Sequence, residues 1–201
     1  MFGRGRASTG RDAHHGSPTG TGKPGEQATE QTPGILGELP PPVTPDSNPP
    51  SAPVFSFSTV DGDEVQLKEI LGTAPVYVFF VPGVNDELDW AQVGRVQDRY
   101  SQFEELGVYV FLIVSDLPTK VLQLRDELGL EFPLIADPLN VIATDWKVFD
   151  LFGGGKSVPA SFVFDAHGVL IARLIAAEPD DRPSVDEVLG VIRESLNAAG
   201  V

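Results

Sequence analysis

The sequence predicts an α/β domain of three layers, with a mixed central sheet and a hairpin at its N-terminal end. From Pro53 onward, apolar strand patterns alternate with amphipathic helix patterns, as in a sheet covered by helices. Two strand patterns near the C-terminus are joined only by the turn Ala166–Gly168, so they are expected to run antiparallel. The hydrophobic share of 41% is enough to form a core.

Residues 1–52 are predicted to be a disordered tail, which leaves residues 53–201 as the domain. The tail is rich in Gly, Pro, Ser and Thr and has one aromatic residue, Phe2, so it can bury too little apolar surface to offset its ordering entropy. Its one apolar cluster comprises Ile35, Leu36 and Leu39. That cluster is either a docking motif for a partner or an incidental feature of a linker, and the second interpretation is favoured.

The domain is expected to open with a hairpin and to contain two buried strands in its first half. PVFSFSTV and EVQL flank a turn at Asp61-Gly62, which is a hairpin signal. The continuous apolar runs APVYVFFV, residues 74–81, and VYVFLIV, residues 108–114, predict strands that are buried on both faces. These two runs are expected to form the centre of the sheet.

Two amphipathic helices are expected to cover this sheet. Asn85 is a suitable N-cap for a helix that reaches Leu106 and ends at Gly107. Its apolar positions, spaced by threes and fours, are Trp90, Val93, Val96, Tyr100 and Phe103. Asp116 is predicted to cap the second helix, which Gly129 closes.

The remaining elements are shorter, apart from the last helix. FPLIAD predicts a brief strand and VIATDW a short helix, while ASFVFD and VLIARLI predict an antiparallel hairpin. Ser184 and Glu187 form a capping box for a final helix. This order of strands and helices is that of the thioredoxin-like fold.

Charge and composition exclude several classes of function. The chain has 14 Lys and Arg against 29 Asp and Glu, a net charge of −15, so nucleic acids and anionic membrane surfaces are poor partners and a basic partner is favoured. The absence of cysteine excludes disulfides, thiolate catalysis and Cys-ligated metal. No apolar run approaches the ~20 residues of a membrane helix, and no secretory signal is apparent. We therefore expect no membrane insertion and a cytoplasmic location.

Five segments in order resemble the peroxiredoxins, the alkyl hydroperoxide reductase and thiol-specific antioxidant class of redoxin domains. They are APVFSFSTVDGDEVQLKEILG, VYVFFVP, DRYSQFEELGVYVFLIVSD, LGLEFPLIADP and ASFVFDAHGVL. The resemblance covers Pro53 to Leu196. It implies a thioredoxin-like fold whose opening hairpin is followed by a short helix.

The reacting positions of that family carry other residues here. The family places a Thr four residues after a Pro and the peroxidatic Cys three residues further; counted from Pro82, these positions are Asp86 and Asp89. Pro159 stands where the family has an Arg. Carboxylates in the first turn would repel a thiolate or a peroxide anion, so the electrostatics of the site are predicted to be reversed. Helix capping explains these acids better than a catalytic carboxylate pair does.

The Val158-Pro159 pair before a strand resembles the proline loop with which thioredoxins hold an extended peptide. The resemblance implies a peptide groove lined by Pro82, Gly83, Val84, Leu88, Trp90, Val158 and Pro159. The alternative is that Leu88 and Trp90 belong partly to the core.

Other chemical signals are weak, and we expect no cofactor and no metal. Gly155-Lys156-Ser157 matches the end of a phosphate-loop motif, but Asp150 replaces its first Gly and a strand follows instead of a helix. The three histidines are split between the tail and one hairpin turn, which gives no metal site.

The sequence therefore favours a non-catalytic peroxiredoxin-like protein that acts as a binding module or accessory subunit for a partner protein of unknown identity. Two alternatives remain open. The chain could be an oxidoreductase with residual or altered activity that uses Asp86, Asp89 or Lys156, or it could be a structural homo-oligomer such as a homodimer.

Overall fold

The computed structural model of the protein describes residues 56–200. The elements in chain order are β1 (Ser56–Ser58), β2 (Glu64–Gln66), α1 (Leu67–Ile70), β3 (Val76–Val81), α2 (Glu87–Gln97), α3 (Tyr100–Glu105), β4 (Tyr109–Val114), α4 (Pro118–Leu128), β5 (Leu134–Ala136), α5 (Val141–Asp145), β6 (Ala160–Phe164), β7 (Leu170–Ile175) and α6 (Val185–Ala199). The predicted tail, with Ile35, Leu36 and Leu39, lies outside the described residues.

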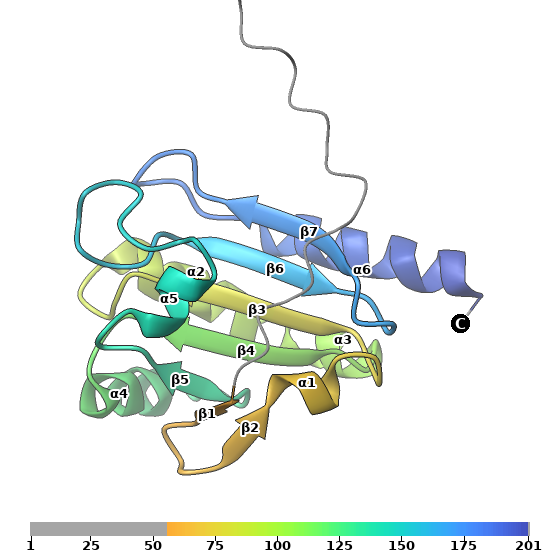
Figure 1. The fold of residues 1–201 in the computed structure, drawn as a ribbon, viewed down its shortest axis with the longest axis horizontal. Coiled ribbons are helices and arrows are strands. Elements are labelled where there is room, and N and C mark those ends of the chain that lie inside the picture. The colour runs from red at the N-terminus through yellow and green to blue at the C-terminus, as the bar shows by residue number, and fades with distance from the viewer. Residues whose placement is uncertain (1–55, 201) are drawn as a thin grey trace, which may run out of the picture. The chain divides into compact units, whose positions relative to one another are not determined.

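A five-stranded mixed sheet forms the centre of the domain, in the order β5-β4-β3-β6-β7 (Figure 1). Strand β3 pairs with β4 in parallel and with β6 antiparallel. Strands β4 and β5 are parallel, whereas β6 and β7 are antiparallel. A separate antiparallel hairpin joins β1 and β2. The predicted α/β class, the mixed sheet and the N-terminal hairpin are confirmed.

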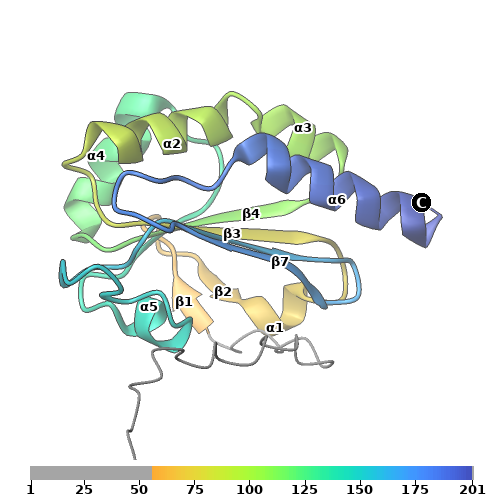
Figure 2. The same cartoon turned by 90° about the horizontal axis from the view of Figure 1, so that it is seen from above.

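Helices α2, α3, α4 and α6 cover one face of the sheet, and α1, α5 and the β1-β2 hairpin cover the other (Figure 2). All six residues of β3 are buried, because successive side chains enter opposite cores. Tyr77 and Phe79 pack under the large helices, whereas Val78 and Phe80 pack on the opposite side. The continuous apolar run that predicted this strand is therefore explained by burial on both faces.

Three local predictions are corrected. The helix predicted from Asn85 to Leu106 is two helices, and its N-cap is Asp86. The break falls at Asp98 and Arg99: Asp98 still has helical dihedral angles, and the backbone departs from them at Arg99, with φ −109° and ψ 3°, without a Gly or Pro. The apolar spacing continues across the break, so the pattern could not reveal it. The N-cap of α4 is Leu117, and the predicted cap Asp116 instead accepts a hydrogen bond from the Leu117 amide at 2.9 Å.

Three loops meet at the carboxyl end of β3. Strand β6 begins beside that end, with Phe80 opposite Ala160, and β7 ends beside the start of β6, with Ala160 opposite Ile175. Two buried hydroxyls hold the loop before β6 in place: Ser157 Oγ donates to the Val81 carbonyl at 3.2 Å and accepts from Ser115 Oγ at 2.8 Å. The turn after β3, the loop before β6 and the segment after β7 are thus brought to one place.

Among residues 56–200, no helix combines the length and apolar character needed to span a membrane.

Candidate functional site

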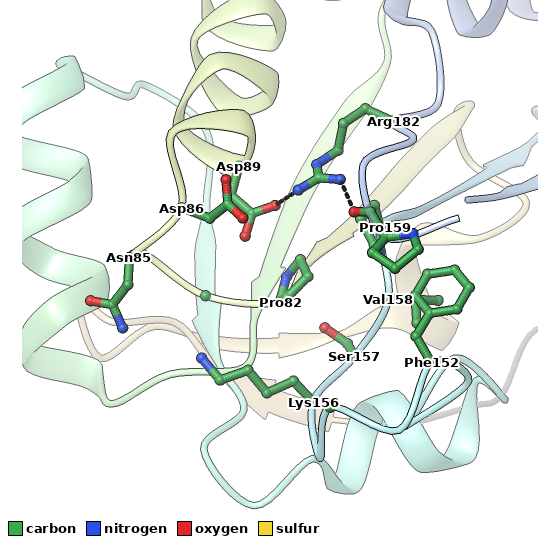
Figure 3. Close-up of a pocket in the computed structure, with 13 residues that line it drawn as sticks. Pro82, Asn85, Asp86, Asp89, Phe152, Lys156, Ser157, Val158, Pro159 and Arg182 are labelled. Carbon is green, nitrogen blue, oxygen red and sulfur yellow. Dashed lines mark hydrogen bonds and ion pairs between the residues drawn. The ribbon is translucent and has the colours of Figure 1, made fainter. Parts of the chain in front are cut away.

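A pocket of about 350 Å³ lies where these three segments meet (Figure 3). Its lining residues are Pro82, Gly83, Asn85, Asp86, Asp89, Phe152, Gly154, Lys156, Ser157, Val158, Pro159, Pro179 and Arg182. We call it the β3 pocket. Its walls are largely apolar, and two carboxylates and two cations are set among them.

The turn from β3 to α2 is fixed by two hydrogen bonds. Asp86 is the N-cap of α2, and its Oδ1 accepts from the Leu88 amide at 2.8 Å. The Trp90 indole nitrogen donates to the Val84 carbonyl at 2.7 Å from the next turn of the helix. The first turn of α2 is therefore held in a defined orientation over the pocket.

Asp89, in this first turn, forms a buried ion pair with Arg182. Arg182 Nη2 lies 2.7 Å from Asp89 Oδ1, and the two side chains are 6% and 3% exposed. Figure 3 shows the two groups pointing toward each other. Arg182 Nη1 also donates to the carbonyls of Pro179 at 2.7 Å and Asp181 at 2.8 Å. The guanidinium is thus held by its own loop in the position that Asp89 requires.

Burial raises the pKa of Asp89 to about 6 from its ordinary 3.8, although the adjacent Arg182 pulls it down. The nearby Asp86 adds to the increase, and Lys156 opposes it. Removal from water disfavours the charged carboxylate by more than one ion pair recovers. Asp89 therefore titrates close to neutral pH.

Lys156 reaches the pocket from the loop before β6. In Figure 3 it extends toward Asn85 and away from Arg182. A Cβ atom at Gly83 would lie 2.6 Å from Lys156 Nζ, so the missing side chain at Gly83 makes room for the ammonium group. The loop is closed by the Asp150 carboxylate, whose Oδ1 accepts from the Gly155 amide at 2.6 Å.

The structure brings together the four positions counted from the peroxiredoxin pattern: Pro82, Asp86, Asp89 and Pro159 all line the β3 pocket. Of the residues proposed for a peptide groove, Gly83 and Val158 also line it. Three others do not: Val84 and Trp90 are partly buried against the core, and Leu88 is 40% exposed.

Sequence reasoning missed Arg182, and two predictions change as a result. The predicted reversal of electrostatics is wrong, because Arg182 and Lys156 place two cations beside Asp86 and Asp89. Helix capping explains Asp86 but not Asp89, which is the buried partner of Arg182. Arg182 is 93 residues from Asp89 and lies in a loop, so no helix or strand periodicity could have indicated the contact.

The AhpC/TSA family matches residues 50–173 of the chain. The chain belongs to this family. Two peroxiredoxins are similar in sequence. A putative peroxiredoxin of Mycobacterium tuberculosis is 31% identical over 125 residues, which are 60% of this chain and 79% of that protein. Peroxiredoxin Bcp of Escherichia coli is 30% identical over 128 residues, which are 58% and 78% of the two chains.

Solved structures of this family share the fold. The reduced 2-Cys peroxiredoxin of Plasmodium vivax has a TM-score of 0.66 at 21% identity, covering 77% of this chain and 99% of that one. Peroxidoxin BcpB of M. tuberculosis has a TM-score of 0.64 at 19% identity, covering 73% and 96%. The family's thiol reaction needs a cysteine, and this chain of 201 residues has none.

A metal site is not apparent in the described part of the chain, where no three His, Cys, Asp or Glu side chains are grouped to hold an ion.

We predict that the mutation Asp89→Ala will lower the free energy of unfolding by about 3–5 kcal/mol, because the buried Arg182 guanidinium loses the oxygen that accepts its hydrogen bond, which even a protonated Asp89 retains. The control is Asp86→Ala in the same turn, which removes a helix cap and should cost about 1 kcal/mol. Urea titrations of both variants measure the difference. Equal costs for the two variants would show that the ion pair is not what holds this region.

We also predict a pH dependence that belongs to Asp89. Its pKa is higher in the folded protein, so the folded state binds the proton more tightly and gains stability as the pH falls through about 6 toward 4. At pH 7 and above Asp89 is largely ionised in the folded protein, and the cost of burying its charge is present. The free energy of unfolding of the wild type, minus that of Asp89→Asn, should therefore rise on acidification, by up to about 3 kcal/mol.

All other titrating groups are common to the wild type and Asp89→Asn, so the difference isolates Asp89. A difference that decreases as the pH falls from 7 to 4 would mean that Arg182 outweighs burial and would contradict the prediction.

Proposed function

We propose that this chain is a non-catalytic member of the AhpC/TSA family, which uses the β3 pocket to bind a segment of a partner protein. The observation that carries the proposal is the Asp89–Arg182 ion pair at the position counted for the peroxidatic cysteine. A carboxylate held by a guanidinium neither attacks a peroxide nor cycles through a disulfide. This position therefore has no thiol for the peroxidase reaction of the family.

The lining of the pocket suits a chain segment with an apolar side chain beside a basic one. Pro82, Phe152, Val158, Pro159 and Pro179 offer apolar surface. Asp86 lies at the pocket with its Oδ1 engaged by an amide, and a carboxylate can accept further hydrogen bonds through its second oxygen. The net charge of −15 favours encounter with a basic partner.

The first test is enzymatic. We expect the full chain, given hydrogen peroxide or an organic hydroperoxide with a thiol reductant, to consume peroxide no faster than buffer. A cysteine-containing member of the family serves as the positive control. Turnover above buffer would overturn the proposal, and its loss in Asp89→Asn, which keeps the volume of the side chain and an oxygen acceptor for Arg182, would assign the altered activity to Asp89.

The second test concerns binding and uses two phenylalanines from the same loop. Phe152, which is 38% exposed, lines the β3 pocket, whereas Phe149, which is 37% exposed, does not. Peptides selected from a random display library against the full chain should lose most of their affinity for Phe152→Ala and keep it for Phe149→Ala. We expect about a tenfold loss, the usual effect of removing a buried aromatic contact worth somewhat over 1 kcal/mol.

Selected peptides that bind both variants equally would place the binding surface elsewhere and contradict the use of the pocket.

A further inference from the structure

A second pocket, of about 430 Å³, lies between the end of α2 and the start of α6. Figure 2 shows these two helix ends side by side above the sheet. We call it the arginine pocket; its charged and polar lining includes Arg95, Asp98, Arg99, Arg182, Ser184 and Asp186. The Gln92 amide, which also lines it, donates to the Pro183 carbonyl at 3.0 Å and joins the two walls.

Three arginines in one pocket are unusual in a chain with 14 basic residues against 29 acidic ones. Arg95 donates to the Gln92 side-chain oxygen at 3.0 Å and forms no ion pair with any residue in the described range 56–200. Arg99 lies 3.3 Å from Asp186, but both side chains are largely exposed to solvent. Exposed pairs of this kind contribute little and exchange readily. Arg95 and Arg99 thus have N–H groups that can donate hydrogen bonds to a ligand.

Arg182 forms the buried side of the arginine pocket. Its Nη1 donates to the carbonyls of Pro179 and Asp181 and its Nη2 to Asp89, whereas its Nε is enclosed and has no hydrogen-bond partner among the described residues. Buried donors are rarely left without a partner, and water or a ligand usually satisfies them. Because this nitrogen is enclosed, Arg182 contributes positive charge to the wall of the arginine pocket, and the donors that a ligand can reach belong to Arg95 and Arg99.

The start of α6 adds backbone donors to the same place. This helix has 15 residues, and its N-cap Ser184 accepts from the Glu187 amide. The preceding amides of Val185 and Asp186 have no intrahelical acceptor, and they lie at the positive end of the helix dipole. Arginines and helix N-terminal amides together are the groups that bind phosphate oxygens.

We propose that the arginine pocket binds a phosphate group, either as the free anion or as the phosphoryl group of a small molecule. Arg95 and Arg99 would donate hydrogen bonds to two of its oxygens, and the first amides of α6 would donate to the others. The volume exceeds that of a phosphate alone, which leaves room for an attached group. Asp98 and Asp186 oppose binding, and the phosphate must displace Asp186 from Arg99, so the free anion should bind weakly.

The test is a titration of the full chain with inorganic phosphate at constant ionic strength, followed by NMR at the amides of Val185 and Asp186. We expect saturable shifts, and about a tenfold loss of affinity in Arg95→Gln, since a charge-assisted hydrogen bond is removed. Arg193→Gln is the matched control: Arg193 also donates to a glutamine oxygen, that of Gln102, at 2.8 Å, but it does not line the pocket. It should change affinity by less than about twofold.

Asp186→Asn provides a test in the opposite direction. Removing this carboxylate frees Arg99 and should increase the affinity for phosphate several-fold. Phosphoserine in place of inorganic phosphate separates the two sources: tighter binding assigns the site to a phosphoryl group on a larger molecule, and equal binding assigns it to the free anion. Equal losses in Arg95→Gln and Arg193→Gln, a lack of saturation, or equally strong binding of malonate would overturn the proposal.

Discussion

The Asp89–Arg182 ion pair is the interaction on which the architecture of the site depends. It joins the first turn of α2 to the segment between β7 and α6, which are far apart in the sequence and adjacent in space. Breaking a buried ion pair leaves an uncompensated charge, which is costly, so the two groups are held in contact. The wall of the β3 pocket and the start of α6 therefore keep one relative position, and Arg182 contributes to both pockets.

The pair is not a simple gain in stability. The pKa of Asp89 rises to about 6 because burial outweighs the attraction of Arg182. Hydrophobic residues of similar volume could be as stable or more so. What the pair supplies is orientation: the guanidinium is fixed by the carbonyls of Pro179 and Asp181, and it in turn fixes the carboxylate. A charged group held in one orientation is more typical of a binding surface than of a hydrophobic core.

The fold could be predicted from local patterns because the segments with the strongest apolar patterns are also the segments that are buried in the folded domain. The continuous apolar runs at β3 and β4 predicted central strands, and both are buried on two faces. Counting from Pro82 found Asp86 and Asp89, since a turn fixes spacing along the chain. The break at Asp98–Arg99 left no trace in a pattern whose apolar spacing continues. The role of Arg182 could not be predicted for a different reason. It contacts Asp89 only because the folded sheet brings two distant segments of the chain together.

The chain and the family pattern differ in which negatively charged group lies at the start of α2. A helix N-terminus favours a negative group, and in the resemblance drawn from the sequence that group is a thiolate. This chain still holds a negative group there, now a carboxylate, and still faces it with a guanidinium. The guanidinium comes from the segment after β7, and Pro159 stands where the family pattern has its Arg. An anion at the start of a helix, paired with a guanidinium, is thus present here with different atoms, and the chain has no cysteine that could supply the thiolate.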